Sequence, residues 1–189
     1  MNIGFALCGS FCTYDTVFPV MEALVKEHRV IPIFSYAAGS TDSRFGKAAD
    51  FAEKAEAICG CKAITTIPDA EPIGPKKLLD VLVIAPCTGN TLAKLAHSIA
   101  DTPVTMAAKS HLRNGRPVVI GLSTNDALAG AAENIGRLLG RKNYYFIPFG
   151  QDDPEKKPHS LVADFSLLPE AFRAMAEHRQ LRPLFLPPK

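Results

Sequence analysis

One short segment limits the folds open to this chain: residues 81–85, Val-Leu-Val-Ile-Ala, form an unbroken apolar run between Asp80 and Pro86. A run of this length without polar alternation is typical of a parallel strand that is covered on both faces. Further strand-like segments and intervening helix-like segments alternate along most of the chain. This alternation predicts an α/β fold, with a doubly wound, mostly parallel six-stranded sheet and helices on both faces. The other five expected strands are 3–7, 30–35, 63–67, 116–121 and 143–149.

Apolar residues at helical spacing predict the connecting helices. One stripe runs from Val17 to Val25, and Pro19 within it makes that helix begin late or kink. Ser123–Asp126 is expected to cap a helix that ends near Gly140, whereas the prolines of 68–75 predict a loop. The remaining expected helices cover 45–55, 92–99 and about 166–179.

No internal repeat or linker divides the chain, so residues 1–189 are predicted to form a single domain. Its proline-rich tail, from about residue 181, cannot be helical. We expect this tail to be an extended arm that packs on another subunit.

The composition argues against several classes of function. The formal net charge is +2 and the basic residues are scattered, so no nucleic-acid partner is expected. No stretch approaches the ~18 apolar residues of a membrane span, and the first residues lack the basic segment of a signal peptide. Five cysteines, an odd number, indicate reduced thiols in a cytoplasm. The spacing of Cys8, Cys12, Cys59 and Cys61 does not match a structural zinc site, so no metal is expected.

Hydroxyl, amide and glycine residues gather where the predicted strands end. Ligands of open parallel sheets bind beyond the carboxyl ends of the strands, so these residues are expected to share one crevice. Neutral donors at helix N-termini suit a phosphate and the edge of a heterocycle, although each turn taken alone also fits ordinary helix capping. The four segments concerned are Gly9–Phe11, Ser35–Tyr36, Pro86–Thr91 and Ser123–Asn125.

The same turns argue against a dinucleotide. A nicotinamide cofactor on this fold needs G-x-G-x-x-G after the first strand and an acidic residue after the second. Neither is present, because the second strand ends Ile33-Phe34-Ser35-Tyr36. A mononucleotide with one terminal phosphate, such as flavin mononucleotide, fits better. Cys87 lies in one of these crevice loops near a helix start, but no histidine is paired with it by sequence, so no catalytic residue is assigned.

Two motifs point to a family. Pro86–Ala96, Pro-Cys-Thr-Gly-Asn-Thr-Leu-Ala-Lys-Leu-Ala, resembles the P-A-[ST]-A-N-T-[LI]-A-K-[LI]-A motif of the flavoprotein superfamily, which includes flavin-dependent cysteine decarboxylases. Cys8–Tyr14 resembles its first loop, T-G-S-I-A-A-Y, which holds the flavin phosphate. The resemblance implies a Rossmann-like flavoprotein fold, flavin mononucleotide as cofactor and a homo-oligomer, with a trimer or a multiple of three expected.

The resemblance also implies roles for individual residues. Ser123–Asn125 falls where the decarboxylases carry a substrate-binding P-x-M-N loop, of which only Asn125 matches, and their catalytic histidine has no counterpart here. The expected cofactor-binding residues are Gly9, Ser10, Phe11, Ser35, Pro86, Thr88, Gly89, Asn90 and Thr91, and the expected substrate-binding residues are Ser123, Thr124 and Asn125.

A longer stretch of the sequence resembles one group within this superfamily. Residues 121–166 are similar to the B subunits of two-subunit synthases that form pyridine-2,6-dicarboxylate in sporulating bacteria. This implies a cyclic dicarboxylate of the lysine pathway as substrate, an A subunit that carries NADP, and the cytoplasm of the mother cell as location. Two alternatives stay open: a decarboxylase-like flavoprotein that uses flavin mononucleotide, and a non-catalytic subunit that keeps the fold.

Overall fold

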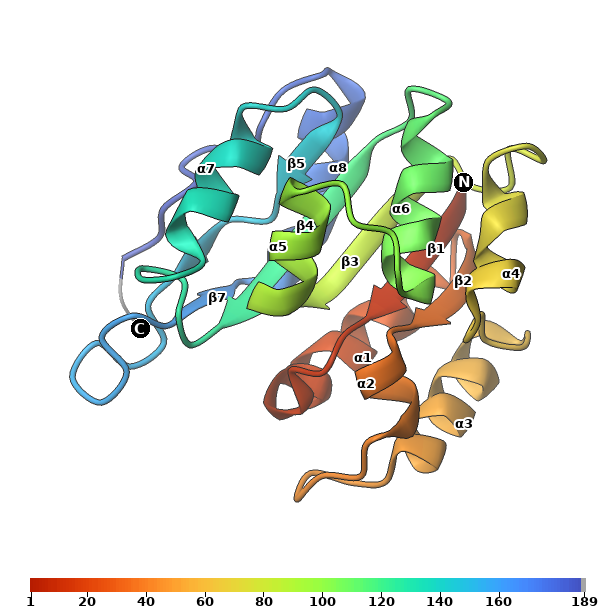
Figure 1. The fold of residues 1–189 in the computed structure, drawn as a ribbon, viewed down its shortest axis with the longest axis horizontal. Coiled ribbons are helices and arrows are strands. Elements are labelled where there is room, and N and C mark those ends of the chain that lie inside the picture. Colours follow the sequence, from red (N-terminus) through yellow and green to blue (C-terminus); the bar gives the residue numbers. More distant parts are fainter. Residues whose placement is uncertain (188–189) are drawn as a thin grey trace.

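The computed structural model describes residues 1–187, which fold around one twisted sheet (Figure 1). Within these residues the sheet has seven strands, and its main path runs β2-β1-β3-β4-β7-β6, with β5 pairing β4 beside that path. The pairs among β2, β1, β3, β4 and β5 are all parallel, so the predicted fold class is confirmed. The strands are β1 (Asn2–Leu7), β2 (Arg29–Phe34), β3 (Val81–Cys87), β4 (Val118–Thr124), β5 (Tyr144–Phe146), β6 (Phe149–Gly150) and β7 (Leu161–Ala163).

Helices cover both faces of the sheet. Figure 1 shows α5, α6 and α7 in front of the strands, with α1 and α8 behind them. The helices are α1 (Tyr14–Leu24), α2 (Tyr36–Ser40), α3 (Ala48–Cys59), α4 (Ile67–Ala70), α5 (Gly89–Ala96), α6 (Pro103–Leu112), α7 (Ala132–Leu139) and α8 (Leu168–Ala176). Three short 3-10 helices join them, at Phe11–Thr13 (η1), Glu71–Ile73 (η2) and Phe165–Leu167 (η3).

The core is centred on β3, whose seven residues are all buried. This agrees with the apolar run that predicted a central strand covered on both faces. Pro86 lies within β3 and has no N–H to donate, and the β3–β4 register shifts between Ile84 and Cys87. Just beyond that shift the chain turns into α5, so the irregularity lies next to the carboxyl end of the sheet.

Strand β4 forks at its carboxyl end. Residues Val118–Ile120 pair with β5 in parallel, whereas Ser123 and Thr124 pair antiparallel with β7. Gly121 lies at the fork, where an added Cβ would come within 2.8 Å of the Phe165 ring and 3.0 Å of the Ala85 side chain. The fork therefore separates β5 from the end of β4 and brings β7 and η3 beside the carboxyl ends of β1 and β4.

The third predicted strand is wrong in detail. Residues 63–67 contribute a single bridge, between Ile33 and Ile64, and the chain then enters α4. Thr66 caps α4 through its side chain, and Pro68 stands in the first turn, where its missing N–H has no intrahelical partner to lose. The predicted loop at 68–75 is accordingly made of α4 and η2. The missed helix α6 begins with Thr102 and Thr105 in a capping box.

The predicted helices differ from the structure mainly at their starts. Helix α1 begins at Tyr14, before Pro19, and continues through that proline, so it does not begin late. Helix α3 begins at Ala48 and leaves Phe45 outside and exposed. Ser123–Asp126 does not cap α7, because these residues finish β4 and enter a turn, and α7 begins at Ala132. The predicted sixth strand, 143–149, is divided into β5 and β6.

The described part of the tail is extended, as predicted, and packs on its own chain. Phe149 N–H donates to the carbonyl of Leu184 (3.0 Å), and Leu186 N–H donates to the carbonyl of Phe149 (2.9 Å). The Phe185 side chain is 66% exposed. Packing on another subunit stays a prediction, and residues 188–189 of the tail lie outside the described residues.

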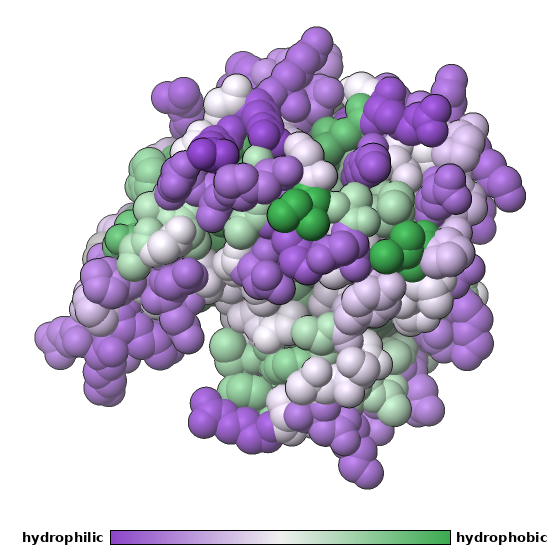
Figure 2. Space-filling model, viewed as in Figure 1, coloured by the Kyte–Doolittle hydropathy of each residue, from purple (hydrophilic) through white to green (hydrophobic). Residues whose placement is uncertain are grey.

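Figure 2 shows that the face seen in Figure 1 is mostly hydrophilic, with apolar side chains in small, separate groups. Every helix in the described chain is too short or too polar to span a lipid bilayer.

Candidate ligand-binding site

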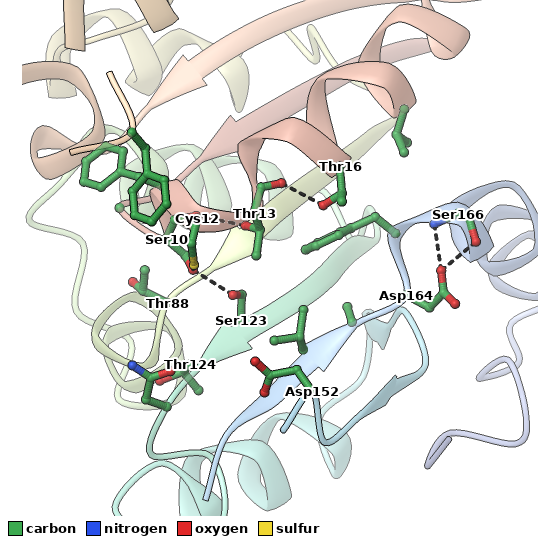
Figure 3. Close-up of a pocket in the computed structure, with 18 of the residues that line it drawn as sticks. Ser10, Cys12, Thr13, Thr16, Thr88, Ser123, Thr124, Asp152, Asp164 and Ser166 are labelled. Carbon is green, nitrogen blue, oxygen red and sulfur yellow. Dashed lines mark hydrogen bonds between the residues drawn. The ribbon is translucent and has the colours of Figure 1, made fainter. Parts of the chain in front are cut away.

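A cavity of about 1240 Å³ lies at the carboxyl ends of β1 and β4. One wall is the β1–α1 loop with the outer side of α1, and the opposite wall is the end of β4 with β7 and η3. Figure 3 shows hydroxyl side chains from both walls pointing into this space. The predicted site residues that line it are Gly9, Ser10, Phe11, Thr88, Ser123, Thr124 and Asn125.

Ser10 and Ser123 join the two walls. Their hydroxyl oxygens are 2.7 Å apart although 113 residues separate them in the sequence (Figure 3). Ser10 N–H donates to the carbonyl of Cys8 (2.8 Å), so its amide is occupied and its hydroxyl is the group that lies at the cavity. The loop is held from below by Tyr14, whose hydroxyl donates to the same carbonyl (3.1 Å).

Ser35, Thr91 and Pro86 stand behind the cavity and do not line it. Ser35 is buried and caps α2, accepting a hydrogen bond from Ala38 N–H (3.2 Å). Thr91 is buried and donates to the Cys8 sulfur (3.4 Å). Pro86 is buried within β3. These residues support the β1 and β3 loops from inside, and their role as cofactor contacts stays a prediction.

Gly89 and Asn90, at the start of α5, also lie outside the cavity lining. An added Cβ on Gly89 would come within 2.8 Å of both Thr124 Oγ1 and Asp126 Oδ1. A carboxylate of the chain itself therefore stands next to the α5 N-terminus, where the helix dipole favours negative charge. Asn90 is exposed. The two turns that looked alike in the sequence thus differ: the β1–α1 turn opens onto the cavity, whereas the β3–α5 turn lines it only through Thr88 and has Asp126 beside Gly89.

The structure adds residues that the sequence patterns did not single out. Thr13 comes from η1 and Thr16 from α1, and Arg44 comes from the segment before α3. Asp152 and Lys157 come from the loop between β6 and β7. This loop, 151–159, protrudes from the molecule, and Figure 2 shows a notch beside it. In the sequence the loop carries charges and prolines of the kind found in many surface loops. No local pattern distinguishes the two residues that reach the cavity.

The charges of the lining are nearly balanced. Two cations, Arg44 and Lys157, face three carboxylates, Asp126, Asp152 and Asp164. Thr124 donates to Asp126, and the Ser166 hydroxyl donates to Asp164 (2.6 Å). The lining therefore offers placed hydroxyl donors more than net positive charge.

The thiol that lines the cavity is that of Cys12, which is exposed and lies 3.8 Å from the Ser10 hydroxyl, whereas the buried thiols give little support to nucleophilic chemistry. Burial raises the pKa of Cys8 to about 11 and raises the pKa of Cys87 well above its usual value, so both thiols stay protonated at neutral pH. No histidine is among the described residues that line the cavity. The described chain holds no group of three or more His, Cys, Asp or Glu side chains placed to bind a metal.

Comparisons with known proteins agree with this architecture. The Flavoprotein family model matches residues 1–137. The chain is 51% identical to the B subunit of dipicolinate synthase from Bacillus subtilis, over 98% of this chain and 93% of that protein. The crystal structure of the dipicolinate synthase B subunit from Bacillus halodurans is 46% identical, with a TM-score of 0.89 over 98% of this chain and 95% of that one.

A more distant structure shares the fold alone. The FMN-dependent cysteine decarboxylase SpaF is 23% identical, with a TM-score of 0.64 over 93% of this chain and 97% of that one. An open parallel sheet with a hydroxyl-lined crevice at its carboxyl ends defines a nucleotide-binding type of α/β protein. The chain belongs to the Flavoprotein family and, within it, to the dipicolinate synthase B subunits.

Proposed function

We propose that this chain is the B subunit of an enzyme that forms pyridine-2,6-dicarboxylate from a cyclic dicarboxylate of the lysine pathway, in the mother cell of a sporulating bacterium. The observation that carries the proposal is the meeting of Ser10 and Ser123 at 2.7 Å on the wall of a large cavity. It unites the loop that resembles a flavin-phosphate loop with the segment that resembles a substrate loop. The similarity to two dipicolinate synthase B subunits supports the same conclusion.

The residues at the β1–α1 loop fit the phosphate end of flavin mononucleotide. The Ser10 hydroxyl faces the cavity, and η1 leads directly into α1, so the first N–H groups of this helical segment have no intrahelical partner. Arg44 lines the same cavity and adds a positive charge. Ser10, Phe11 and Thr88 would hold the cofactor, and flavin supplies a two-electron acceptor when it is bound.

The end of β4 supplies the substrate side of the proposed site. Ser123 and Thr124 offer hydroxyl groups, and Asn125 offers an amide, to a carboxylate of the substrate. The reaction requires loss of water from a hydroxylated tetrahydro ring, followed by a two-electron oxidation to the aromatic ring. This chain lacks the glycine fingerprint and the ribose-binding acid of a nicotinamide site. We assign NADP to the A subunit for that reason.

We further propose that the chain acts as a homo-oligomer bound to the A subunit. Several large apolar side chains are exposed in the described chain, among them Tyr36, Phe45, Leu128 and Phe185. Covering them in subunit contacts would remove apolar surface from water. Light scattering of the purified chain at micromolar concentration, with and without the A subunit, tests this, and a monomer in both samples contradicts it.

A reconstitution experiment tests the function. The chain, the A subunit and their mixture are each supplied with substrate and NADP, and formation of reduced nicotinamide is followed. We expect turnover by the mixture and none by this chain alone. Full turnover by the A subunit alone would contradict the proposal. The visible absorption of the purified chain separates the remaining alternatives, because activity of the mixture without any flavin spectrum assigns this chain a flavin-independent role.

A further inference from the structure

An ion pair in the loop between β6 and β7 stands at the cavity. Lys157 Nζ donates to Asp152 Oδ2 at 2.9 Å, and both residues line the cavity. Figure 3 shows the Asp152 carboxylate pointing toward Ser123 and Thr124. The Lys157 side chain is half exposed and that of Asp152 is 29% exposed, so neither is fully buried. The proposed cofactor and substrate contacts described above do not involve this pair.

Asp152 retains capacity to accept hydrogen bonds. A carboxylate has about four lone-pair positions, and Lys157 occupies one of them. Oδ1 is shielded from water and accepts no hydrogen bond from the described residues. The nearby Ser160 hydroxyl donates to the side-chain oxygen of Asn125 (3.5 Å). Because Oδ1 is shielded, a ligand in the cavity would reach the carboxylate at Oδ2, which accepts from Lys157 and has a further lone pair.

Both partners of the pair stay charged at neutral pH. Burial acts to raise the pKa of Asp152, but the hydrogen bond from Lys157 and the proximity of Ser160 outweigh it and lower the pKa. The hydrogen bond to Asp152 raises the pKa of Lys157. The pair is therefore a fixed dipole, with a permanent acceptor beside a permanent donor. A ligand edge that matches it carries a hydrogen on nitrogen next to a carboxylate.

Building on the proposed function, we propose that Asp152 and Lys157 recognise the ring nitrogen of the substrate and its neighbouring carboxylate. A partly reduced ring carries its nitrogen as a protonated imine or as an enamine N–H, either of which donates to Asp152 while Lys157 contacts the adjacent carboxylate. The aromatic product has a bare nitrogen lone pair in the same place. That lone pair faces the Asp152 carboxylate and is repelled by it. The pair therefore favours binding of the substrate over the product.

Two stable dicarboxylates test this selectivity. Piperidine-2,6-dicarboxylate carries N–H donors between its carboxylates, whereas pyridine-2,6-dicarboxylate presents a lone pair there. Binding of each to the flavin-loaded chain is measured by calorimetry in buffer freed of divalent cations. We expect the wild type to bind the piperidine compound about tenfold more tightly than the pyridine compound. This ratio corresponds to one additional hydrogen bond to a charged group.

Three variants separate the contributions of Asp152 and Lys157 to this preference. Asp152→Asn is expected to abolish or reverse the preference, because its amide can donate to the pyridine nitrogen. Lys157→Gln is expected to weaken both compounds to a similar extent and to keep the preference. Glu155→Gln removes the same charge as Asp152→Asn from an exposed residue of the same loop, and it should change neither affinity. An unchanged thermal unfolding temperature for each variant shows that the substitution in the loop has not unfolded the chain.

An unchanged preference in Asp152→Asn would overturn this inference and leave the proposed function standing. Failure of the wild type to bind either compound would also overturn it. In that case the reconstitution with the A subunit still reports separately on the proposed function.

Discussion

At the carboxyl ends of the parallel strands, polar side chains line a cavity of about 1240 Å³, whereas at the amino ends they bond to the backbone of their own chain. Before β4, His111 Nε2 lies 3.0 Å from the carbonyl of Pro117. Before β3, Asn114 donates to the carbonyl of Gly74 (2.8 Å), and Asp80 accepts from Asn2 N–H (2.8 Å). These groups at the amino ends thus have backbone partners, although the buried His111 Nδ1 has none among the described residues, and several groups at the carboxyl ends face open space.

This contrast separates stability from function. Groups with internal partners contribute to the free energy of unfolding, and groups that face a cavity contribute to ligand affinity. Substitutions at the amino end should therefore change stability with little effect on ligands, and those at the carboxyl end should do the reverse. The predictions below test this separation, from the largest expected effect to the smallest.

The largest effect is expected from His111 and pH. Burial lowers the pKa of His111 from 6.5 to about 4, so the unfolded chain binds a proton that the folded chain does not. The contribution of His111 is therefore fully present above about pH 6.5 and is lost as the pH falls toward 4, by up to about 3 kcal/mol. Urea unfolding at pH 7 and pH 4.5 measures this loss. His111→Gln should flatten the difference, and an equal pH dependence in that variant would contradict the assignment.

Gly74→Ala should lower the free energy of unfolding by about 2 kcal/mol. An added Cβ would come within 2.6 Å of the carbonyl oxygen of Ser110, which belongs to the backbone of α6 and cannot rotate away. Gly136→Ala in α7 is the matched control, because nothing lies within 4 Å of its added Cβ, and it should be neutral or stabilising. Thermal unfolding compares the two, and flavin affinity should be the same in both. A stable Gly74→Ala variant would show that α6 can shift.

Ser10→Ala should weaken binding of flavin mononucleotide about tenfold, since one hydrogen bond to a charged phosphate is lost. Its stability should change by about 1 kcal/mol or less, because the hydroxyl loses a neutral, part-buried hydrogen bond with Ser123 on the cavity wall. Flavin fluorescence titration measures the affinity. Ser40→Ala is the control, because that hydroxyl is exposed and donates to the carbonyl of Tyr36 (2.7 Å). Unchanged flavin affinity in Ser10→Ala would remove the β1–α1 loop from the cofactor site.

The smallest effect is expected from Asn90→Ala. The family resemblance gives Asn90 a ligand contact, whereas the structure leaves its side chain exposed and outside the cavity. From the structure we expect the activity of the mixture with the A subunit to change less than about twofold, compared with about tenfold for one lost ligand hydrogen bond. A tenfold loss would show that the ligand extends from the cavity onto the α5 turn.

Local sequence patterns predicted much of the fold. The apolar run of β3 indicated a buried central strand, and the alternation of strands and helices indicated a parallel sheet. Both signals can be read from neighbouring residues in the sequence. The predicted third strand at 63–67 was wrong, because helix capping by Thr66 competes there with sheet pairing that amounts to a single bridge. Helix α6 was missed although Thr102 and Pro103 mark its start.

The candidate site was predicted in part. Ser10 and Thr88 follow parallel strands and Ser123 lies at the carboxyl end of one, so their meeting at one edge follows from the topology. Asp152 and Lys157 could not be predicted, because they reach the cavity through the pairing of β7 with β4, and no local pattern encodes that pairing. Likewise, the sequence did not distinguish the β3–α5 turn, which has Asp126 beside Gly89, from the β1–α1 turn, which opens onto the cavity.

The sequence by itself determined the α/β class, the edge of the sheet that carries the site and the family, since each depends on periodicity or on short motifs. Only the tertiary structure decided which of the strand-end residues face a common space. The fork of β4, the position of Asp126 beside α5 and the placement of loop 151–159 each join segments far apart in the chain. Such contacts are selected by packing and hydrogen bonding of the whole fold, which a local pattern does not specify.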